Sequence, residues 1–452
     1  MFKNIVYLES EVTMRDWYSR LLLACVLAKN DYVVVTGRKG RIHDLVKDAQ
    51  GGIWFSNTFT DYRYESVIKY ARNNLQYIFA FCDESPGIDN EYWYQSMRCG
   101  ENAVKNVDMI LASSDYHRDV LMQKFSQADF KDLLKVFPVG VPRFDLLDPT
   151  FNPLYETQVQ KIKEGYENFV LVPLHGMEKT DSEIHDLTMR RVRQGKMKSS
   201  DFDKRIGYYK DHRETHKCFI QDIFKLAKLV PATKFIIRHK NLFPGLHTED
   251  HNSKSIPANI VFDSKYSIHP WILASDLMIH NNSVAGIESE IANVKTIFYN
   301  PNKKNTNAAV IPRKINKYIE NFEELVSVFE EKTYDERQNG NKNYYVPNFN
   351  QMSYKKIESL VQQVEPQLIG KYKFSHLNPK KGKFKFLMQL LHHNIYSGIS
   401  KSNTGKGGPI RYMETREAFK LISEILFPNS TNDLTIRPID NEVYVIQRNQ
   451  MM

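Results

Sequence analysis

Two pairs of acidic residues near the start of the chain have the types and spacing for acid/base or nucleophilic chemistry. Glu9 and Glu11 follow the first strand-like run, and Asp83 and Glu84 follow the fourth. Because the carboxyl ends of parallel strands meet at one edge of a sheet, the pairs are expected at the same cleft. Neighbouring carboxylates can divide the roles of nucleophile and acid/base. The alternative is that these acids begin helices, where the dipole favours negative charge.

A small polar turn that opens into a helix gives a second candidate site. The segment NNSVAGIESEI follows an apolar run, so Asn281, Asn282 and Ser283 are expected at the carboxyl edge of a sheet. Ser283 or Asn282 suits the N-cap position, and Gly286 leaves the backbone of the first turn uncovered. Free amides and the helix dipole then favour a phosphate, with Glu288 as the contact for a ribose. The alternative is an ordinary capped helix with a solvated glutamate.

Cationic side chains end two further strand-like runs. Arg238 and His239 follow the run 234–237, where a cation can neutralise a leaving phosphate. His280 ends the run before the polar turn, and it is either a direct ligand of the donor or a local hydrogen-bonding partner. We therefore predict a donor-binding edge in the second half of the chain.

A pair of histidines one helical turn apart superficially suggests a metal site. His212 and His216 are separated by Arg-Glu-Thr, which puts the glutamate in the wrong place for an HExxH motif, and no third ligand is evident. A charged helix face explains the pair better. We expect no metal and no other cofactor, because a helix dipole and cations can bind the phosphates.

The composition is that of a globular cytoplasmic protein with more than one domain. Of 452 residues, 42% are hydrophobic and 12% aromatic. No run approaches the roughly 18 apolar residues of a membrane span, and the chain start lacks a signal-peptide pattern. Cys25, Cys82, Cys99 and Cys218 show no CxxC spacing, so we expect reduced, structural thiols.

The net charge of +9 is unevenly spread. The segment from Lys371 to Lys385 has six lysines and no acid, interleaved with aromatic residues. Such a segment predicts peripheral attachment to an anionic membrane surface, on the inner face of the cytoplasmic membrane, and the alternative is a solvated basic surface. No aromatic stacking module or groove-reading motif accompanies the charge, so nucleic acid is not an expected partner.

Strand-like apolar runs alternate with amphipathic helical stretches along most of the chain. This alternation predicts parallel sheets with helices on both faces. The expected strands are 5–8, 32–36, 52–55, 77–82, 108–112 and 134–139, then 169–174, 234–237, 259–262, 276–279 and 295–298. The expected helices include 14–28 and 91–106.

A proline-punctuated stretch, VGVPRFDLLDPTFNPLYE, separates the two sets of strands. It predicts two tandem doubly wound, Rossmann-like domains, 1–145 on the acceptor side and 166–350 for the nucleotide sugar, joined by a linker at 146–165. Residues 351–452 are expected to form C-terminal helices and a basic extension. Ligands of such sheets bind at the carboxyl ends of the strands, here between the domains. The charged excursion 175–208 is either an acceptor-binding lid or a solvated insertion.

Several blocks of the sequence resemble one group of enzymes. One segment of this chain resembles the donor-binding segment of GT-B glycosyltransferases: HPWILASDLMIHNNSVAGIESEIANVKTIFYNP. The resemblance is closest to bacterial surface-carbohydrate biosynthesis proteins related to β-Kdo transferases. The group's first strand and helix are similar to YLESEVTMRDWYSRLLLACVLAKNDYVVVTGRKG, its DEEG motif to CDESPG, and its GNPRFDLL linker to GVPRFDLLDP. The chain departs from the group at Ser85 in the DEEG motif, at Val284 and Ala285 in place of threonines, and at IIRHKN in place of RPHP.

The resemblance implies a GT-B enzyme that moves a sugar from a nucleotide donor, CMP-Kdo or a similar ulosonic acid, to a growing surface polysaccharide or lipopolysaccharide. The acceptor would be a lipid-linked glycan. Asp83 would be the nucleophile, Glu9 or Glu11 the acid/base, and Arg15 would position an acidic sugar. Three alternatives remain: a UDP- or GDP-hexosyltransferase, a polyol-phosphate transferase of the CDP-glycerol kind, and a catalytically silent scaffold of glycan assembly, which the changed Ser85 and Ala285 allow.

Overall fold

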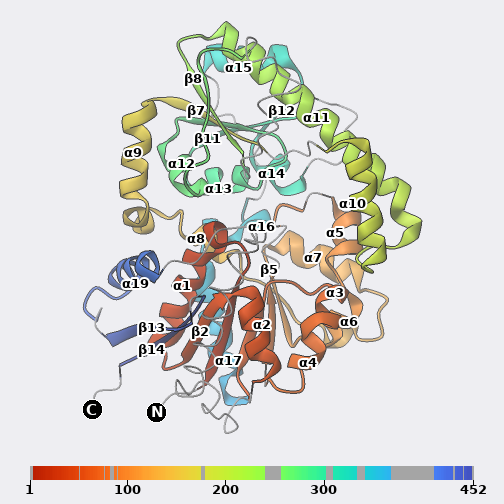
Figure 1. Cartoon of the computed structure of the whole chain (residues 1–452), viewed down its shortest axis with the longest axis vertical. Helices are drawn as coiled ribbons and strands as arrows, with labels where there is room; N and C mark the ends of the chain where they lie inside the picture. Colours follow the sequence, from red (N-terminus) through yellow and green to blue (C-terminus); the bar gives the residue numbers. More distant parts are fainter. Residues whose placement is uncertain are drawn as a thin grey trace, which may run out of the picture.

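The protein folds into two α/β units, each built on a sheet with helices on both faces (Figure 1). The computed structural model describes residues 4–49, 51–75, 77–81, 86–88, 90–174, 179–239, 256–301, 309–332, 342–367, 412–430, 433–440 and 442–449. The predicted α/β class is confirmed, and each of the expected strands is present within a few residues of its expected bounds.

The first sheet has the strand order β13-β14-β2-β1-β3-β4-β5-β6. Neighbours from β2 to β6 pair in parallel, whereas β14 pairs antiparallel with both β2 and β13. The strands are β1 Ile5–Ser10, β2 Val33–Arg38, β3 Ile53–Ser56, β4 Tyr77–Phe81, β5 Met109–Ala112, β6 Val136–Pro138, β13 Leu434–Asp440 and β14 Val443–Arg448. Strands β1, β3, β4 and β5 are buried on both faces, which is why they appear in the sequence as continuous apolar runs.

Helices cover both faces of this sheet. Alternate residues of β1 point to opposite sides, so Val6 and Leu8 pack with α1, α17 and α19, and Ile5 and Tyr7 with α2, α4, α6 and α7. The helices are α1 Thr13–Lys29, α2 Lys39–Lys47, α3 Asp61–Arg63, η1 Tyr64–Ile68, α4 Lys69–Ala71, α5 Glu91–Met97, α6 Glu101–Lys105, α7 Asp115–Lys124, η2 Lys131–Leu133, α17 Ser353–Val364, η8 Glu365–Gln367 and α19 Tyr412–Leu426. The single helix expected over 91–106 is wrong: it is broken at Gly100, where a side chain would collide with the backbone of Asp61.

The second sheet is parallel throughout, with the order β12-β11-β10-β7-β8-β9. Its strands are β7 Phe169–Leu174, β8 Lys234–His239, β9 Ile260–Phe262, β10 Leu277–His280, β11 Lys295–Tyr299 and β12 Lys317–Ile319. Helices α11 and α15 cover one face, and α9 and α12 the other. The helical segments of this half are α9 Glu156–Tyr166, α10 Asp181–Arg193, η4 Ser199–Asp201, α11 Phe202–Leu229, α12 Ile268–Ala274, α13 Ala285–Ile291, α14 Val310–Ile315, α15 Phe322–Glu331, α16 Lys342–Tyr345 and η7 Pro347–Phe349.

The segment expected to be a linker is buried and helical. It forms α8 (Pro142–Asp145), η3 (Pro149–Leu154) and α9, and Phe144 packs with Ile287 and Ile311 of the second half. The carboxylate of Asp145 accepts hydrogen bonds from the backbone amides of Ser353 and Tyr354, both at 2.8 Å. The proline-rich stretch therefore joins the domains as a packed interface and not as a flexible tether.

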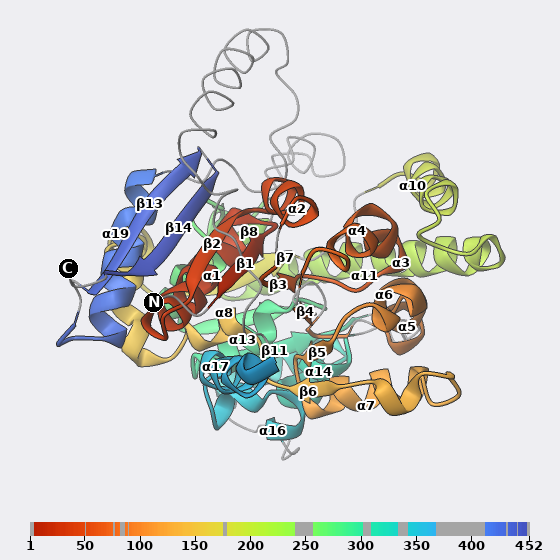
Figure 2. The same ribbon diagram turned by 90° about the horizontal axis from the view of Figure 1, so that it is seen from below.

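The charged excursion 175–208 is largely helical where the structure describes it, with α10 over Asp181–Arg193, η4 over Ser199–Asp201 and the start of α11. Helix α10 and the first half of α11 make a hairpin that leaves the second domain and reaches α5 of the first (Figures 1 and 2). Trp93 of α5 packs with Ile184 and Tyr208 of the hairpin, and the Tyr92 hydroxyl donates a 2.6 Å hydrogen bond to Asp201. The hairpin thus bridges the two domains.

The end of the chain returns to the first domain. Helix α17 packs on α1 and α8, α19 packs on α1, and β13 and β14 extend the first sheet beside β2 (Figure 2). We expected C-terminal helices and a basic extension here, and in the described part of this segment the helices pack in the core of the first domain while two strands extend its sheet. The basic segment Lys371–Lys385 lies outside the described residues.

The carboxyl ends of strands from both sheets face each other. Residues 86–88, beyond β4, meet α13 and α14: the amides of Val310 and Ile311 donate to the carbonyls of Ile88 and Gly87 at 3.0 and 3.1 Å. Gly87 also lies beside Val284, in the turn that follows β10. Two Rossmann-like domains with opposed strand ends constitute the GT-B architecture, and this prediction is confirmed. Described helices include none long and apolar enough to cross a membrane.

Candidate functional site

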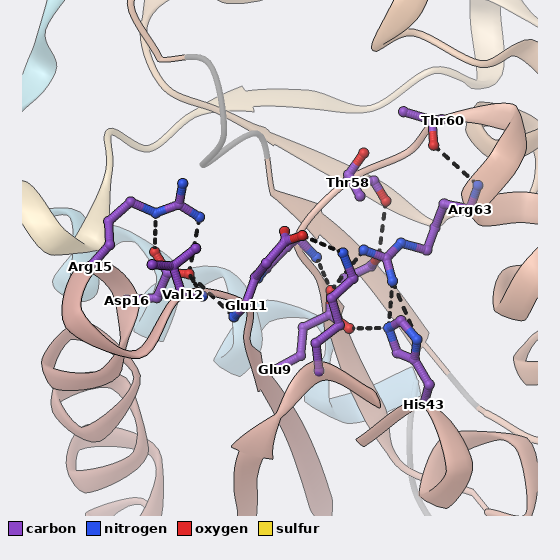
Figure 3. Close-up of polar contacts among 12 residues, drawn as sticks. Glu9, Glu11, Val12, Arg15, Asp16, His43, Thr58, Thr60 and Arg63 are labelled. Carbon is purple, nitrogen blue, oxygen red and sulfur yellow. Dashed lines mark hydrogen bonds and ion pairs between the residues drawn. The ribbon is translucent and has the colours of Figure 1, made fainter. Parts of the chain in front are cut away.

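The carboxyl end of β1 holds a buried carboxylate that is fully engaged by hydrogen bonds. The side chain of Glu9 is 0% exposed. One oxygen accepts from the backbone amide of Asn57 at 2.8 Å, and the other lies 2.6 Å from Nε2 of His43 on α2 (Figure 3). A carboxylate accepts hydrogen bonds only, so the Nε2 atom carries the proton in this contact. Glu9 therefore sets the ring orientation of His43.

Arg63 completes the cluster from the other side. Its guanidinium lies 3.5 Å from Glu9, and its Nη1 atom lies 2.5 Å from Nε2 and 3.4 Å from Nδ1 of His43 (Figure 3). With Nε2 donating to Glu9, Nδ1 is the ring nitrogen that can accept from Arg63. The short helix α3 holds it there, because the Thr60 side chain accepts from the backbone amide of Arg63 at 3.1 Å. Lys39, at the start of α2, pairs with Glu11 at 2.7 Å. We call Glu9, His43 and Arg63 the Glu–His–Arg cluster.

The electrostatics of this cluster fix the charge of Glu9. Burial by itself raises the pKa of the carboxyl, but the charge of Arg63 and the hydrogen bond of His43 outweigh it and hold the pKa at about 2. The buried carboxylate is therefore ionised at neutral pH. The acid/base role of Glu9 stays a prediction, and His43, 15% exposed, is the more accessible of the two side chains.

Glu9→Gln is expected to change the pH dependence of stability. The pKa of Glu9 is lowered from 4.5 to about 2, so its contribution is fully present above pH 4.5 and is lost as the pH falls toward 2. The contribution amounts to about 3 kcal/mol. Urea unfolding at pH 7, 4 and 3 should show a less stable variant at pH 7 that loses less stability on acidification. Parallel pH curves for the variant and the wild type would contradict this electrostatic role.

The Glu–His–Arg cluster opens into a large cleft between the first domain and the α10–α11 hairpin. The cleft has a volume of about 920 Å³. Its described lining carries eight lysine or arginine side chains and two carboxylates: Lys39, Arg63, Arg98, Arg190, Arg191, Lys196, Lys198 and Arg205, with Glu11 and Asp61. We call it the basic cleft. Such an excess of cations over acids suits an anionic ligand.

The other residues predicted for the first domain lie in different places. Glu11 lines the basic cleft, as expected for a residue that meets substrate. Arg15 is engaged by Asp16, with its Nε atom 2.5 Å from the carboxylate, and does not line the cleft. Its role in positioning a sugar stays a prediction. Asp83 and Glu84 lie outside the described residues, and their roles stay predictions.

In the second domain, the histidine before the polar turn has a local structural role. His280 is 0% exposed; its Nε2 atom is 3.0 Å from the Asn316 side chain, and its Nδ1 atom accepts from the amide of Ser283 at 3.3 Å. A side chain on Gly286 would collide with the imidazole ring. This is the alternative in which His280 is a hydrogen-bonding partner, and Gly286 is required by packing against it.

The turn itself is compact, and its helix begins later than expected. The N-cap of α13 is Val284, without a side-chain cap, so the prediction of Ser283 or Asn282 as the cap is wrong. The Ser283 hydroxyl accepts instead from the amide of Ala285 at 3.2 Å. Asn282 has a left-handed backbone with φ of 57°, and its side chain accepts from the amide of Ala309. Asn281 is buried. A phosphate contact at this turn stays a prediction.

Glu288 is buried in an ion pair with Arg143 of α8, in the segment that was expected to be a linker. Its carboxylate is 3.0 Å from Nε of Arg143 and 3.7 Å from Nε2 of His269. Burial raises its pKa, but the His269 hydrogen bond and the charge of Arg143 overcome this effect and hold the pKa at about 2. The other nitrogen of His269 is 3.0 Å from the hydroxyl of Tyr155. The solvated glutamate of the alternative is excluded, and a ribose contact would have to be shared with this ion pair.

Arg238 and His239 end β8 at the carboxyl edge, as predicted. The guanidinium of Arg238 donates to the carbonyl of Tyr266 at 2.6 Å, and burial lowers the pKa of Arg238 to about 10. The backbone amide of His239 donates to the Ser264 hydroxyl at 3.0 Å. Neither residue lines the basic cleft, so the predicted donor side and this cleft are distinct places.

Sequence reasoning missed the two side chains that complete the Glu–His–Arg cluster. His43 is a single histidine in an ordinary amphipathic helix, and Arg63 lies in a short helix with no motif. Only the position of α2 directly after β2, with its start at the carboxyl edge beside Glu9, could have suggested His43. Among the described residues, no three potential metal ligands come together. Cys25, Cys99 and Cys218 form no disulfide within the described part of the chain.

Comparison with known proteins gives similarities to solved structures. No family model matches the sequence, and no curated protein matches it. UDP-GlcNAc 2-epimerase from Neisseria meningitidis bound to UDP-GlcNAc has 12% identity and a TM-score of 0.47, over 79% of this chain and 99% of that chain. The enzyme from Methanocaldococcus jannaschii with UDP-GlcNAc and UDP has 11% identity and a TM-score of 0.43, with the same coverage. The wall teichoic acid polymerase TagF has 12% identity and a TM-score of 0.48, over 81% and 90%. At such identities the function has to be derived from the site.

Proposed function

We propose that the protein is a GT-B glycosyltransferase that uses His43 to activate an acceptor hydroxyl in the basic cleft. The observation that carries this proposal is the Glu–His–Arg cluster at the carboxyl edge of the first sheet, opening into a cleft with a cationic lining. A histidine oriented by a buried carboxylate is the arrangement that general-base catalysis requires.

The proposed step moves one proton and exchanges one bond. The acceptor hydroxyl gives its proton to Nδ1 of His43, the ring nitrogen that does not face Glu9, as its oxygen forms a bond to the anomeric carbon of the donor. The bond from that carbon to the donor's phosphate oxygen breaks, and the nucleotide leaves with the electron pair. The ionised Glu9 stabilises the imidazolium that forms, and the nearby Arg63 favours return of the proton afterwards. If Asp83 is instead a nucleophile, as the sequence resemblance implies, His43 would activate the acceptor in the second of two displacements.

We assign the donor to the second domain. The turn after β10 and the cations that end β8 lie at the carboxyl edge of its sheet, where ligands of such folds bind. The resemblance of the 269–301 segment to donor-binding segments supports a nucleotide sugar, and within that class CMP-Kdo or a similar ulosonic acid. The acceptor would be a surface glycan, and the segment Lys371–Lys385 would hold the enzyme near a membrane.

Thermal unfolding in the presence of CMP, CDP, UDP and GDP tests this proposal. A ligand that binds only the native state stabilises it by RT ln(1 + [L]/Kd), about 2.7 kcal/mol at 100 times Kd. We expect CMP to raise the Tm and UDP and GDP to leave it unchanged. A shift with UDP or GDP would indicate a hexosyltransferase, and a shift with CDP alone a polyol-phosphate transferase. If no nucleotide raised the Tm, the scaffold alternative would replace the enzyme.

A further inference from the structure

Three arginines line the part of the basic cleft where the α10–α11 hairpin packs against the first domain. Arg191 comes from α10 and Arg205 from α11, whereas Arg98 directly follows α5 of the first domain. We call them the arginine cluster. It exists only because the hairpin packs against the first domain, so each domain supplies part of it.

Arg205 is the most buried member of the cluster. Its side chain is 8% exposed, and its guanidinium packs on the rings of Trp93, Tyr208 and Tyr209 at 4.3 to 4.7 Å from their centroids. Within the described part of the chain, its buried Nε atom has no hydrogen-bond partner. A buried guanidinium donor without an acceptor costs free energy, which an incoming anion would offset.

Arg191 also lacks an acidic partner. Its hydrogen bond in the described structure is to the sulfur of Met97 at 3.9 Å, and its guanidinium packs on the ring of Tyr209. Burial lowers the pKa of Arg191, and the like charges of Arg205 and Arg98 lower it further. An anion bound between them would offset this repulsion, and within the described residues the buried Nε atom of Arg205 has no acceptor, while Arg191 bonds only the Met97 sulfur.

The position of the cluster favours the acceptor over the donor. His43 and Glu11 line the basic cleft, and none of residues 280–288 of the predicted donor turn lines it. A molecule that extends from His43 along the cleft would reach the arginine cluster. A guanidinium matches phosphate with two parallel hydrogen bonds, which makes arginine the side chain suited to this group.

We propose that the arginine cluster binds a phosphate group of the acceptor while the acceptor's hydroxyl lies at His43. The acceptor is then a phosphorylated glycan or a glycan linked to a lipid through phosphate. The assignment of the bound phosphate to an acceptor rests on the proposed function, whereas the anion site itself does not. The α10–α11 hairpin, which the sequence left open as a lid or an insertion, is the element that provides this phosphate site.

Titration calorimetry of the full chain with inorganic pyrophosphate tests the site. Arg191→Gln removes one charge of the cluster and should weaken pyrophosphate binding roughly tenfold to a hundredfold, the range expected for a charged hydrogen bond. Arg193→Gln removes the same charge from the exposed side of the same helix and does not line the cleft, so its binding should match the wild type. Equal binding by both variants, or equal loss in both, would overturn the proposal.

Further measurements distinguish a loss of binding from misfolding of the variant, and distinguish failure of the anion site from failure of the proposed function. If Arg191→Gln lowers the Tm sharply, Arg98→Gln replaces it, because Arg98 is a half-buried member of the arginine cluster and the same loss of binding is expected. Nucleotide stabilisation should be unchanged in Arg191→Gln. A cluster-dependent pyrophosphate site without any nucleotide response would remove the proposed function and keep the anion site. A nucleotide response with pyrophosphate binding that ignores the cluster would do the reverse.

Discussion

His43→Gln should reduce sugar transfer by about 10²- to 10⁴-fold, the usual contribution of a general base, while leaving the stabilisation by nucleotide unchanged. The imidazole is the outward-facing member of the Glu–His–Arg cluster, and glutamine preserves a polar group of similar size without a nitrogen that accepts a proton. The fall should appear in kcat, because the residue acts on the acceptor proton and not on donor binding. The measurement is release of nucleotide from the donor that the thermal series identifies, with and without acceptor.

A matched control uses the exposed histidine of the hairpin. His185→Gln changes the same chemistry at a side chain that does not line the basic cleft, and it should retain full activity. Glu9→Gln should lower kcat as well and shift its pH profile, since Glu9 acts through His43. Wild-type rates in His43→Gln would remove His43 from the mechanism and return attention to Glu11 and Asp83.

Glu288→Gln should destabilise the protein by about 3–5 kcal/mol, the cost of leaving a buried charge without its partner. Arg143 is 5% exposed, and its guanidinium contacts Glu288 at 3.0 Å across the domain interface. Because glutamine keeps the shape and hydrogen-bonding capacity, the loss is electrostatic. The free energy of unfolding is measured by urea unfolding at pH 7, followed by circular dichroism. In the less stable variant, the interface between the two domains should separate before the domains unfold.

A second substitution separates a structural from a ligand-binding role of Glu288. Arg143→Met in the Glu288→Gln background removes the uncompensated charge and should regain part of the lost stability. Glu331→Gln, at the exposed end of α15, should be neutral. If Glu288→Gln were as stable as the wild type yet lost the nucleotide response, the structural role would be excluded and the assignment of Glu288 to the ribose would be supported.

Local patterns in the sequence were sufficient for the architecture. Strands buried on both faces require apolar residues at every position, so β1, β7 and β10 stand out against the helices between them. The parallel arrangement and the location of ligand sites at strand ends follow from that alternation. Glu9, Glu11 and the turn after β10 were placed at those ends for the same reason. The short strand β12 and the strand β13, which lie toward sheet edges, had no comparable apolar signal.

Tertiary packing decided which side chains act together. Glu9 contacts His43 and Arg63 because α2 and α3 bring these side chains against it, and the spacing of the three residues in the chain does not predict these contacts. Glu288 is held by Arg143, 145 residues away, and the arginine cluster requires α10 and α11 to cross to the other domain. Periodicity records only which face of an element is buried, whereas the partner of a buried charge depends on contacts between elements distant in sequence. The sequence therefore determined the two sheets and their edges, and the fold determined the chemistry at those edges.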